Sequence, residues 1–216
     1  MKYGWLLLLL FCQQAFSQTV EGFKTQPERP GNEDIAGNPY VLNGWNDGVI
    51  KFTSGRIVKQ FKLKFDCLNN QLLLQFEGNT FAAESKVMEF VIYPKGKKGD
   101  SMVFRKGYPS IDRGNENTYY QVLIDGKSTL LRLFVKLIIE EKQIVGGQVS
   151  KKTDDDEAFY LLQDKAMISL PREKNNVHES FPLYKDEIHQ YIVKEQLKMR
   201  NAVDFMKLVQ YYNSIL

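Results

Sequence analysis

The sequence TLLRLFVKLIIE at residues 129–140 decides the fold. From residue 131 onward its odd positions are all aliphatic, whereas Arg132, Lys136 and Glu140 occupy even positions. This two-residue period predicts a β-strand. Phe134 on the even side indicates that this face is partly covered as well, which is typical of a strand inside a sheet.

The pair Asp125-Gly126 precedes this strand and predicts a type I′ hairpin with residues 118–124. A two-residue loop fixes the register of the two strands. The expected opposed pairs are Ile124 with Lys127, Val122 with Thr129, and Tyr120 with Leu131. We therefore expect one shared face for Tyr120, Val122, Ile124, Leu131, Leu133 and Val135.

A second hairpin is predicted for residues 47–53 and 56–66, where apolar residues alternate with lysines. Further strands are predicted at residues 71–76, 87–93, 101–105, 143–149, 158–163 and 165–170. The links between them leave no room for crossover helices. The expected fold is mostly β (α+β), an antiparallel meander of roughly ten strands.

The apolar period changes to that of a helix after Pro182, with Tyr184, Ile188, Tyr191 and Ile192 on one face. Asn201 is the expected N-cap of a last helix. Its apolar face carries Ala202, Phe205, Met206, Val209 and Tyr212. A shorter helix is predicted within residues 171–180, which gives two or three C-terminal helices closing over the sheet or a partner.

The N-terminus has the order of a secretory signal peptide, with Lys2, the apolar run WLLLLLF at residues 5–11, and small residues before Gln18. The run is well short of the roughly 20 residues that span a bilayer. We expect cleavage after Ser17, a periplasmic or secreted location and no transmembrane span in the mature chain. The expected organisation is a signal peptide over residues 1–17, an extended polar leader over 18–46, an antiparallel β domain over 47–170 and a helical segment over 171–216.

Composition excludes several classes of site. The formal net charge of +3 over 216 residues predicts no nucleic-acid partner. Cys67 is the one cysteine left after cleavage, so it has no internal disulfide partner and is expected to behave as a small buried hydrophobe. His178 and His189 lie outside any HExxH pattern, and residues 154–157 lack the spacing of a calcium loop. We expect no metal and no cofactor, a solvated hairpin tip at residues 154–157, and core positions for Tyr119, Tyr120, Tyr211 and Tyr212.

Two short stretches carry the motifs of a hydrolase. GDSM at residues 99–102 resembles the serine block of GDS-type (SGNH) lipases and esterases, and DEIH at 186–189 resembles their Asp-x-x-His block. The resemblance implies Ser101 as nucleophile, His189 as its base and Asp186 as the residue that orients the base. The lysine-rich loop before Ser101, the missing strand–helix alternation and the missing oxyanion-hole blocks depart from that family. We therefore assign no catalytic residue, and expect a turn at Ser101 and helix surface at the other two.

The chain as a whole resembles a group of small exported proteins from Bacteroidota-type bacteria without an established function. The segments that carry the resemblance are GNPYVL at residues 37–42, the strand at 45–52, KLKFD at 62–66, QLLL at 71–74 and YYN at 211–213. The resemblance implies a β-meander with a helical tail and an envelope location, and it supplies no catalytic residue.

The sequence thus predicts an exported, non-catalytic binding or structural module of the bacterial cell envelope, whose partner is an envelope protein or glycan. Two alternatives remain open. One is a serine esterase that uses Ser101 and His189. The other is an outer-membrane β-barrel, which is disfavoured by the helical C-terminus and by charged residues on both faces of several strands.

Overall fold

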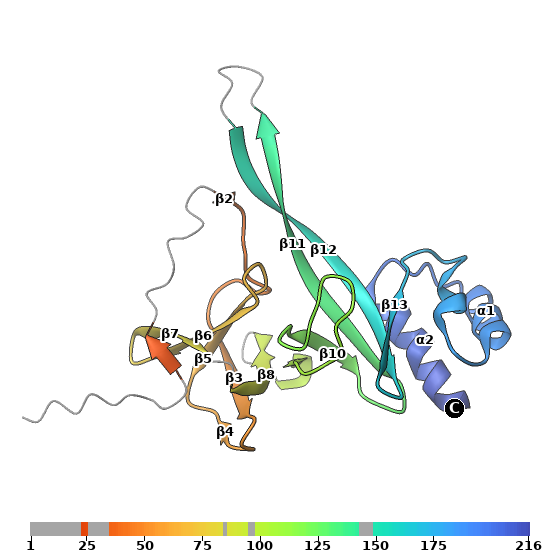
Figure 1. Cartoon of the computed structure of the whole chain (residues 1–216), viewed down its shortest axis with the longest axis horizontal. Coiled ribbons are helices and arrows are strands. Elements are labelled where there is room, and N and C mark those ends of the chain that lie inside the picture. The colour runs from red at the N-terminus through yellow and green to blue at the C-terminus, as the bar shows by residue number, and fades with distance from the viewer. Residues whose placement is uncertain (1–22, 26–34, 84–85, 95–97, 143–148) are drawn as a thin grey trace, which may run out of the picture.

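The computed structural model describes residues 23–25, 35–83, 86–94, 98–142 and 149–216, and it shows one large sheet with two helices near the C-terminus (Figure 1). The strand order is β1-β7-β6-β5-β3-β8-β9-β10-β11-β12-β13, and neighbours on this path are antiparallel. Its strands are β1 (Phe23–Thr25), β3 (Asn46–Phe52), β5 (Lys62–Asp66), β6 (Gln71–Phe76), β7 (Asn79–Ala83), β8 (Val87–Tyr93), β9 (Met102–Arg105), β10 (Tyr120–Ile124), β11 (Thr129–Lys142), β12 (Val149–Gln163) and β13 (Ala166–Leu170). The predicted mostly antiparallel β fold is confirmed.

The strands from β3 to β9 in chain order, residues 46–105, curl around their own hydrophobic core, and we call this part of the sheet the curled half. Of the six residues predicted to share the inward face of the second hairpin, five are buried in this core, namely Ile50, Phe52, Phe61, Leu63 and Phe65. The sixth, Ile57, is 56% exposed, so its expected place in the core is wrong. Gly48 lies within β3, which is flanked by β5 and β8. A Cβ at Gly48 would lie 2.3 Å from the carbonyl oxygen of Val91, so the close approach of the three strands requires glycine there.

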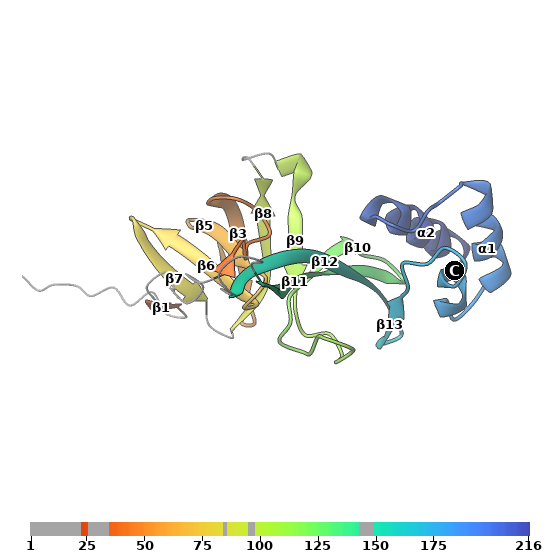
Figure 2. The same ribbon diagram turned by 90° about the horizontal axis from the view of Figure 1, so that it is seen from above.

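Strands β11 and β12 form a long two-stranded ribbon that extends beyond the rest of the sheet (Figure 1). On the outer side of β11, β10 pairs only with residues 130–132. On the outer side of β12, β13 pairs only with residues 159–163. We call residues 133–142 and 149–158 the arm. Figure 2 shows β10, β11 and β12 between the curled half at one end of the molecule and the helices at the other.

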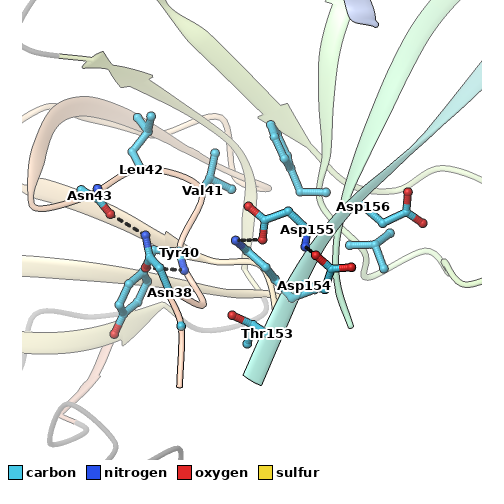
Figure 3. A pocket seen from close by; sticks show the side chains of 13 residues that line it. Asn38, Tyr40, Val41, Leu42, Asn43, Thr153, Asp154, Asp155 and Asp156 are labelled. Carbon is cyan, nitrogen blue, oxygen red and sulfur yellow. Dashed lines mark hydrogen bonds and ion pairs between the residues drawn. The ribbon is translucent and has the colours of Figure 1, made fainter. Parts of the chain in front are cut away.

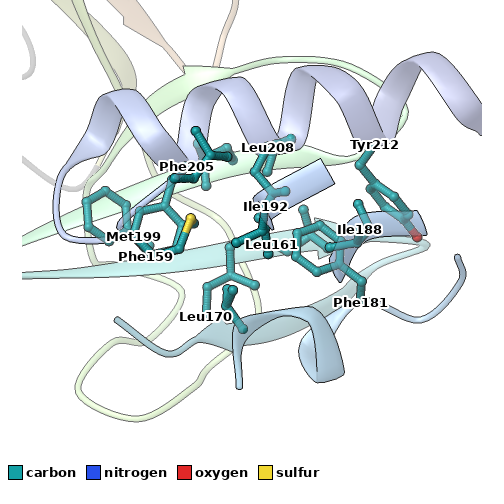
Figure 4. Packing of buried hydrophobic residues seen from close by; sticks show 14 residues of the cluster. Phe159, Leu161, Leu170, Phe181, Ile188, Ile192, Met199, Phe205, Leu208 and Tyr212 are labelled. Atoms are coloured by element: carbon teal, nitrogen blue, oxygen red, sulfur yellow. The ribbon is translucent and has the colours of Figure 1, made fainter. Parts of the chain in front are cut away.

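The helices α1 (Lys185–Lys194) and α2 (Ala202–Ile215) cover one face of the sheet near β13 (Figure 4). Asn201 is the N-cap of α2 as predicted, because its Oδ1 accepts the backbone N–H of Asp204 at 3.0 Å. Phe205 stacks on Phe159 of β12 with 4.2 Å between ring centroids. The expected short helix is the 3-10 helix η3 (Val177–Ser180). The amphipathic helices therefore close over the sheet of their own chain.

Three of the four tyrosines expected in the core are buried. Tyr119 lies in the core of the curled half, and Tyr212 lies in the helix-covered core. Tyr120 faces the opposite side of the sheet, where its ring makes edge contacts with Tyr108 and Tyr160 at 5.7 and 5.6 Å. The fourth, Tyr211, is partly buried and stacks on Tyr191 with 4.0 Å between centroids.

The predicted type I′ hairpin is wrong in its loop and its register. Val122 opposes Leu131, and Ile124 opposes Leu130 after an irregularity in β10. Gly126 is not among the residues with positive φ, which a type I′ turn requires. The physical reason is a tertiary contact, because Asn213 of α2 bonds both backbone groups of Ser128 in this loop. As a result Ile124 packs toward the helices, whereas Tyr120, Val122, Leu131, Leu133 and Val135 share the opposite face as expected.

The predicted hairpin tip at residues 154–157 is also wrong. These residues lie inside β12 and pair with residues 134–137 of β11. The strand continues through them because cations accompany the acidic side chains, as in the ion pair between Lys136 and Asp155. The strand predicted at residues 143–149 falls largely on 143–148, which lie outside the described residues.

The leader contributes two short strands to the sheet. Phe23–Thr25 (β1) pairs with β7, and Ile35–Ala36 (β2) runs parallel to β12. The remaining small strand, Ile57–Val58 (β4), pairs with β3. The expected signal peptide over residues 1–17 lies outside the described residues.

Candidate functional site

An open groove runs between the leader and the arm, with a volume of about 630 Å³ (Figure 3). One wall is the segment at residues 37–43, and the other is formed by residues 134–136 of β11 and 153–156 of β12. We call this feature the arm groove. The lining is Gly37, Asn38, Tyr40, Val41, Leu42, Asn43, Phe134, Val135, Lys136, Thr153, Asp154, Asp155 and Asp156.

Backbone contacts hold the leader wall against the curled half. The carbonyl of Pro39 accepts the backbone N–H of Cys67 at 3.0 Å and its thiol at 3.1 Å. The N–H of Val41 donates to the carbonyl of Phe65 at 3.1 Å. These bonds to the end of β5 and the residue after it give the wall a fixed place beside the arm.

A close approach joins the leader to the arm as well. Gly37 has a φ of +123°, and a Cβ on it would lie 2.0 Å from Thr153 Oγ1. Both the left-handed conformation and the lack of space require glycine at this position. The parallel pairing of β2 with Lys151 and Lys152 precedes this contact along the chain.

The arm wall is a run of acidic side chains that are mostly matched by cations. Lys136 Nζ lies 2.5 Å from Asp155 Oδ1, and the Lys136 side chain is only 9% exposed whereas that of Asp155 is 76% exposed. Asp156 pairs with Arg172 at 2.9 Å. Arg113 lies 3.7 Å from the same carboxylate. Ion pairs of the acidic run with Lys136, Arg172 and Arg113 therefore stabilise an arm that has little hydrophobic cover.

Asp154 differs from its neighbours in the run. It is exposed, its Oδ1 accepts the backbone N–H of Asp155 at 3.1 Å, and none of the ion pairs in the described part of the chain includes it. Leu137, 38% exposed, stands opposite Asp154 in the ladder. The groove thus presents an exposed carboxylate at Asp154, whereas Leu137 lies outside the groove lining.

A second, smaller cavity of about 200 Å³ shares residues 134–136 with the groove and also contacts Cys67. Burial raises the pKa of the Cys67 thiol from 9.0 to about 11, and the nearby Lys136 only partly offsets this. A thiol that stays protonated is a poor nucleophile. Cys67 is partly buried, packs on the core of the curled half and bonds the Pro39 carbonyl, which agrees with its expected behaviour as a small hydrophobe.

The structure separates the residues of the hydrolase motifs. Ser101 is exposed and lies between the 3-10 helix η2 (Lys98–Asp100) and β9, directly before the strand. Asp186 and His189 are exposed on α1, where helix surface was expected. Figures 1 and 2 agree that α1 lies at the end of the molecule away from the curled half that contains β9.

The sequence did not predict that η3 and α1 bring the two histidines together. The rings of His178 and His189 lie 4.6 Å apart, and His178 Nε2 is 3.1 Å from Glu179 Oε1. Within the part of the chain that the structure describes, no group of three or more histidine, cysteine or acidic residues could hold a metal ion.

The groove itself was also missed, because its two walls lie more than ninety positions apart in the sequence. The available signal was charge. Arg132 and Lys136 stand on one face of a predicted strand, and an acidic run follows at residues 154–157 within reach of a hairpin. Cross-strand pairing of opposite charges stabilises a sheet, so this pattern favours a prediction in which the ribbon of β11 and β12 extends through residues 154–157.

No protein-family model matches this chain, and the comparisons with curated proteins and with solved structures found no similar protein. Among the described residues, neither helix is long and apolar enough to cross a membrane.

Proposed function

We propose that this protein is an exported, non-catalytic binding module of the bacterial cell envelope and that its partner lies in the arm groove. The observation that carries the proposal is the groove, an open depression of about 630 Å³ with walls from distant parts of the chain. The signal-peptide pattern over residues 1–17 and the resemblance to small exported Bacteroidota-type proteins support the location.

The chemistry of the groove favours a protein partner with a basic side chain. Asp154 offers an exposed carboxylate that no cation in the described structure neutralises. Val41 and Leu42 on the leader wall offer apolar surface, and a combination of apolar contact with charge complementarity is typical of protein recognition.

A glycan partner is less favoured by the same lining. Sugar rings stack on open aromatic faces, and the groove lining includes two aromatic rings. The Phe134 ring has Arg132 Cζ over it at 4.3 Å from its centroid. The second ring is that of Tyr40. Lys64 Nζ lies over this ring at 3.7 Å from its centroid, so one face is already covered.

Site-specific photocrosslinking in envelope preparations of the native host tests the proposal. A photoreactive residue placed at Asn43, on the leader wall, is expected to give a discrete adduct with one envelope protein. The matched control is the same residue at Ile57 of β4, which is 56% exposed and outside the groove lining. Equal adducts from both positions, or none from Asn43, would contradict the proposal.

The esterase alternative has its own test. A panel of short-chain esters would reveal turnover by the purified protein, and loss of that turnover in Ser101→Ala would replace the binding-module proposal with a hydrolase. We expect no turnover above that of a Ser101→Ala control.

A further inference from the structure

The outer edge of β11 is open along the arm. β10 pairs with β11 only at residues 130–132, and no other strand in the described part of the chain pairs with this edge beyond Arg132. On the other side of the arm, β12 pairs with β2 at Lys151 and Lys152. Figure 1 shows the upper part of β11 with no chain beside it on the side away from β12. An open edge presents unpaired N–H and C=O groups that can pair with another strand.

The open edge carries three apolar side chains in a row. Leu137, Ile138 and Ile139 are 38, 48 and 37% exposed. Because neighbouring side chains of a strand point to opposite faces, Leu137 and Ile139 lie on one face of the arm and Ile138 lies on the other. Natural proteins usually protect such edges with charges, proline or a bulge, so an apolar open edge marks an interaction site.

We propose that the occupant of this edge is a second copy of the chain, paired antiparallel through β11 with Ile138 facing itself on the two-fold axis. In this register Leu137 opposes the partner's Ile139, and Lys136 opposes the partner's Glu140. Each apolar residue meets an apolar residue, and the flanking charges are opposite.

Other registers lose this complementarity. A shift of the pairing by two residues places Ile138 opposite either the partner's Glu140 or the partner's Lys136. An isologous contact requires one surface to be complementary to itself, and residues 136–140 meet that condition in the register centred on Ile138. The two arms would then form one continuous four-stranded ribbon, with backbone hydrogen bonds across the axis.

The pairing and the groove use largely different residues. Of residues 136–140 on the open edge of β11, only Lys136 also lines the groove, where its ammonium pairs with Asp155. The short pairing of the two β11 strands buries less area than most stable interfaces do. We therefore expect a dimer whose population rises with protein concentration rather than a permanent dimer.

Sedimentation equilibrium over a wide concentration range tests the dimer. We expect a monomer–dimer equilibrium for the wild-type protein and monomers for Ile138→Lys and for Ile138→Glu, because each variant places two like charges face to face. An equimolar mixture of the two variants should dimerise again, since lysine then faces glutamate. The control is Val203→Lys on α2, which is 58% exposed and should dimerise like the wild type.

A covalent readout covers the case in which charged variants fold poorly. In a Cys67→Ala background, Ile138→Cys should form an intermolecular disulfide on mild oxidation, because directly opposed residues of an antiparallel pair have the Cα separation that a disulfide needs. Leu183→Cys, at a position 51% exposed, is the control and should stay largely monomeric. A monomeric wild type at all concentrations, a dimer that survives both Ile138 charge variants, or equal disulfide yields at positions 138 and 183 would overturn the proposal.

Discussion

The side chain of Asn213 bonds the backbone of Ser128 in both directions. The N–H of Ser128 donates to Asn213 Oδ1 at 2.7 Å, and Asn213 Nδ2 donates to the Ser128 carbonyl at 2.8 Å. The amide thereby replaces a strand partner for a loop residue that is fully buried. This contact connects the end of α2 to the loop between β10 and β11, 85 positions away in sequence.

Replacement of Asn213 by alanine is expected to lower the free energy of unfolding by about 1–3 kcal/mol, because both backbone groups of Ser128 lose their partner. The measurement is equilibrium unfolding in urea. Ser214→Ala, which removes an exposed hydroxyl bonded to the Tyr211 carbonyl, is the matched control and should change stability by less than about 0.5 kcal/mol. Equal effects of the two substitutions would contradict a special role for Asn213.

The helices depend on the sheet for their cover, and Phe205 lies at the centre of that contact. Phe205 is fully buried and stacks on Phe159, so Phe205→Ala should destabilise the protein by about 3–5 kcal/mol through lost burial and a residual cavity. Thermal unfolding followed by circular dichroism measures this. Val203→Ala, on the same helix but 58% exposed, should be close to neutral, and a comparable loss there would argue against the packing described.

Stability should fall at alkaline pH in a manner that depends on Cys67. Burial raises the pKa of its thiol in the folded state from 9.0 to about 11. The thiol therefore contributes its full stabilisation below about pH 9, and this contribution is lost as the pH rises to about 11, by about 2 kcal/mol. Between pH 8 and pH 11, the free energy of unfolding of the wild type should fall by this amount relative to that of Cys67→Ala. A difference between the two proteins that stays constant over this range would show that the thiol is not desolvated.

The pair formed by Lys136 and Asp155 should respond asymmetrically to substitution. Asp155→Asn leaves the largely buried Lys136 ammonium without its carboxylate and is expected to cost about 1 kcal/mol, a value reduced by the exposure of Asp155. Lys136→Met keeps the apolar stem, removes the charge and should cost less. The double variant should resemble Lys136→Met. A larger loss from Lys136→Met than from Asp155→Asn in urea unfolding would contradict this account of the arm.

The sequence predicted the elements that alternate or repeat locally. The face shared by Phe61, Leu63 and Phe65 and the N-cap at Asn201 could be inferred because burial on one face leaves a period, and because capping chemistry is local. The antiparallel class followed from short links between strands, since crossover helices need more residues.

The arm and the groove could not be predicted in the same way. Residues 155–157 of β12 are paired ionically and Asp154 is exposed, so this run lacks the hydrophobic period of a strand. The conformation of the loop before β11 is set by the bonds between Asn213 and Ser128 rather than by the turn propensity of Asp125-Gly126. The register of β10 on β11 therefore differs from the predicted one. The approach of Gly37 to Thr153 joins segments that have no local relation in the sequence.

The central claim, that the arm groove holds an envelope partner through its acidic wall, is tested most directly by crosslinking yield from a photoreactive residue at Asn43 in the presence and absence of Asp154→Lys. The account predicts a discrete adduct that falls severalfold when the exposed carboxylate is reversed in charge, and that persists with the charge reversal Glu116→Lys outside the groove lining. An adduct of unchanged yield in Asp154→Lys would contradict it.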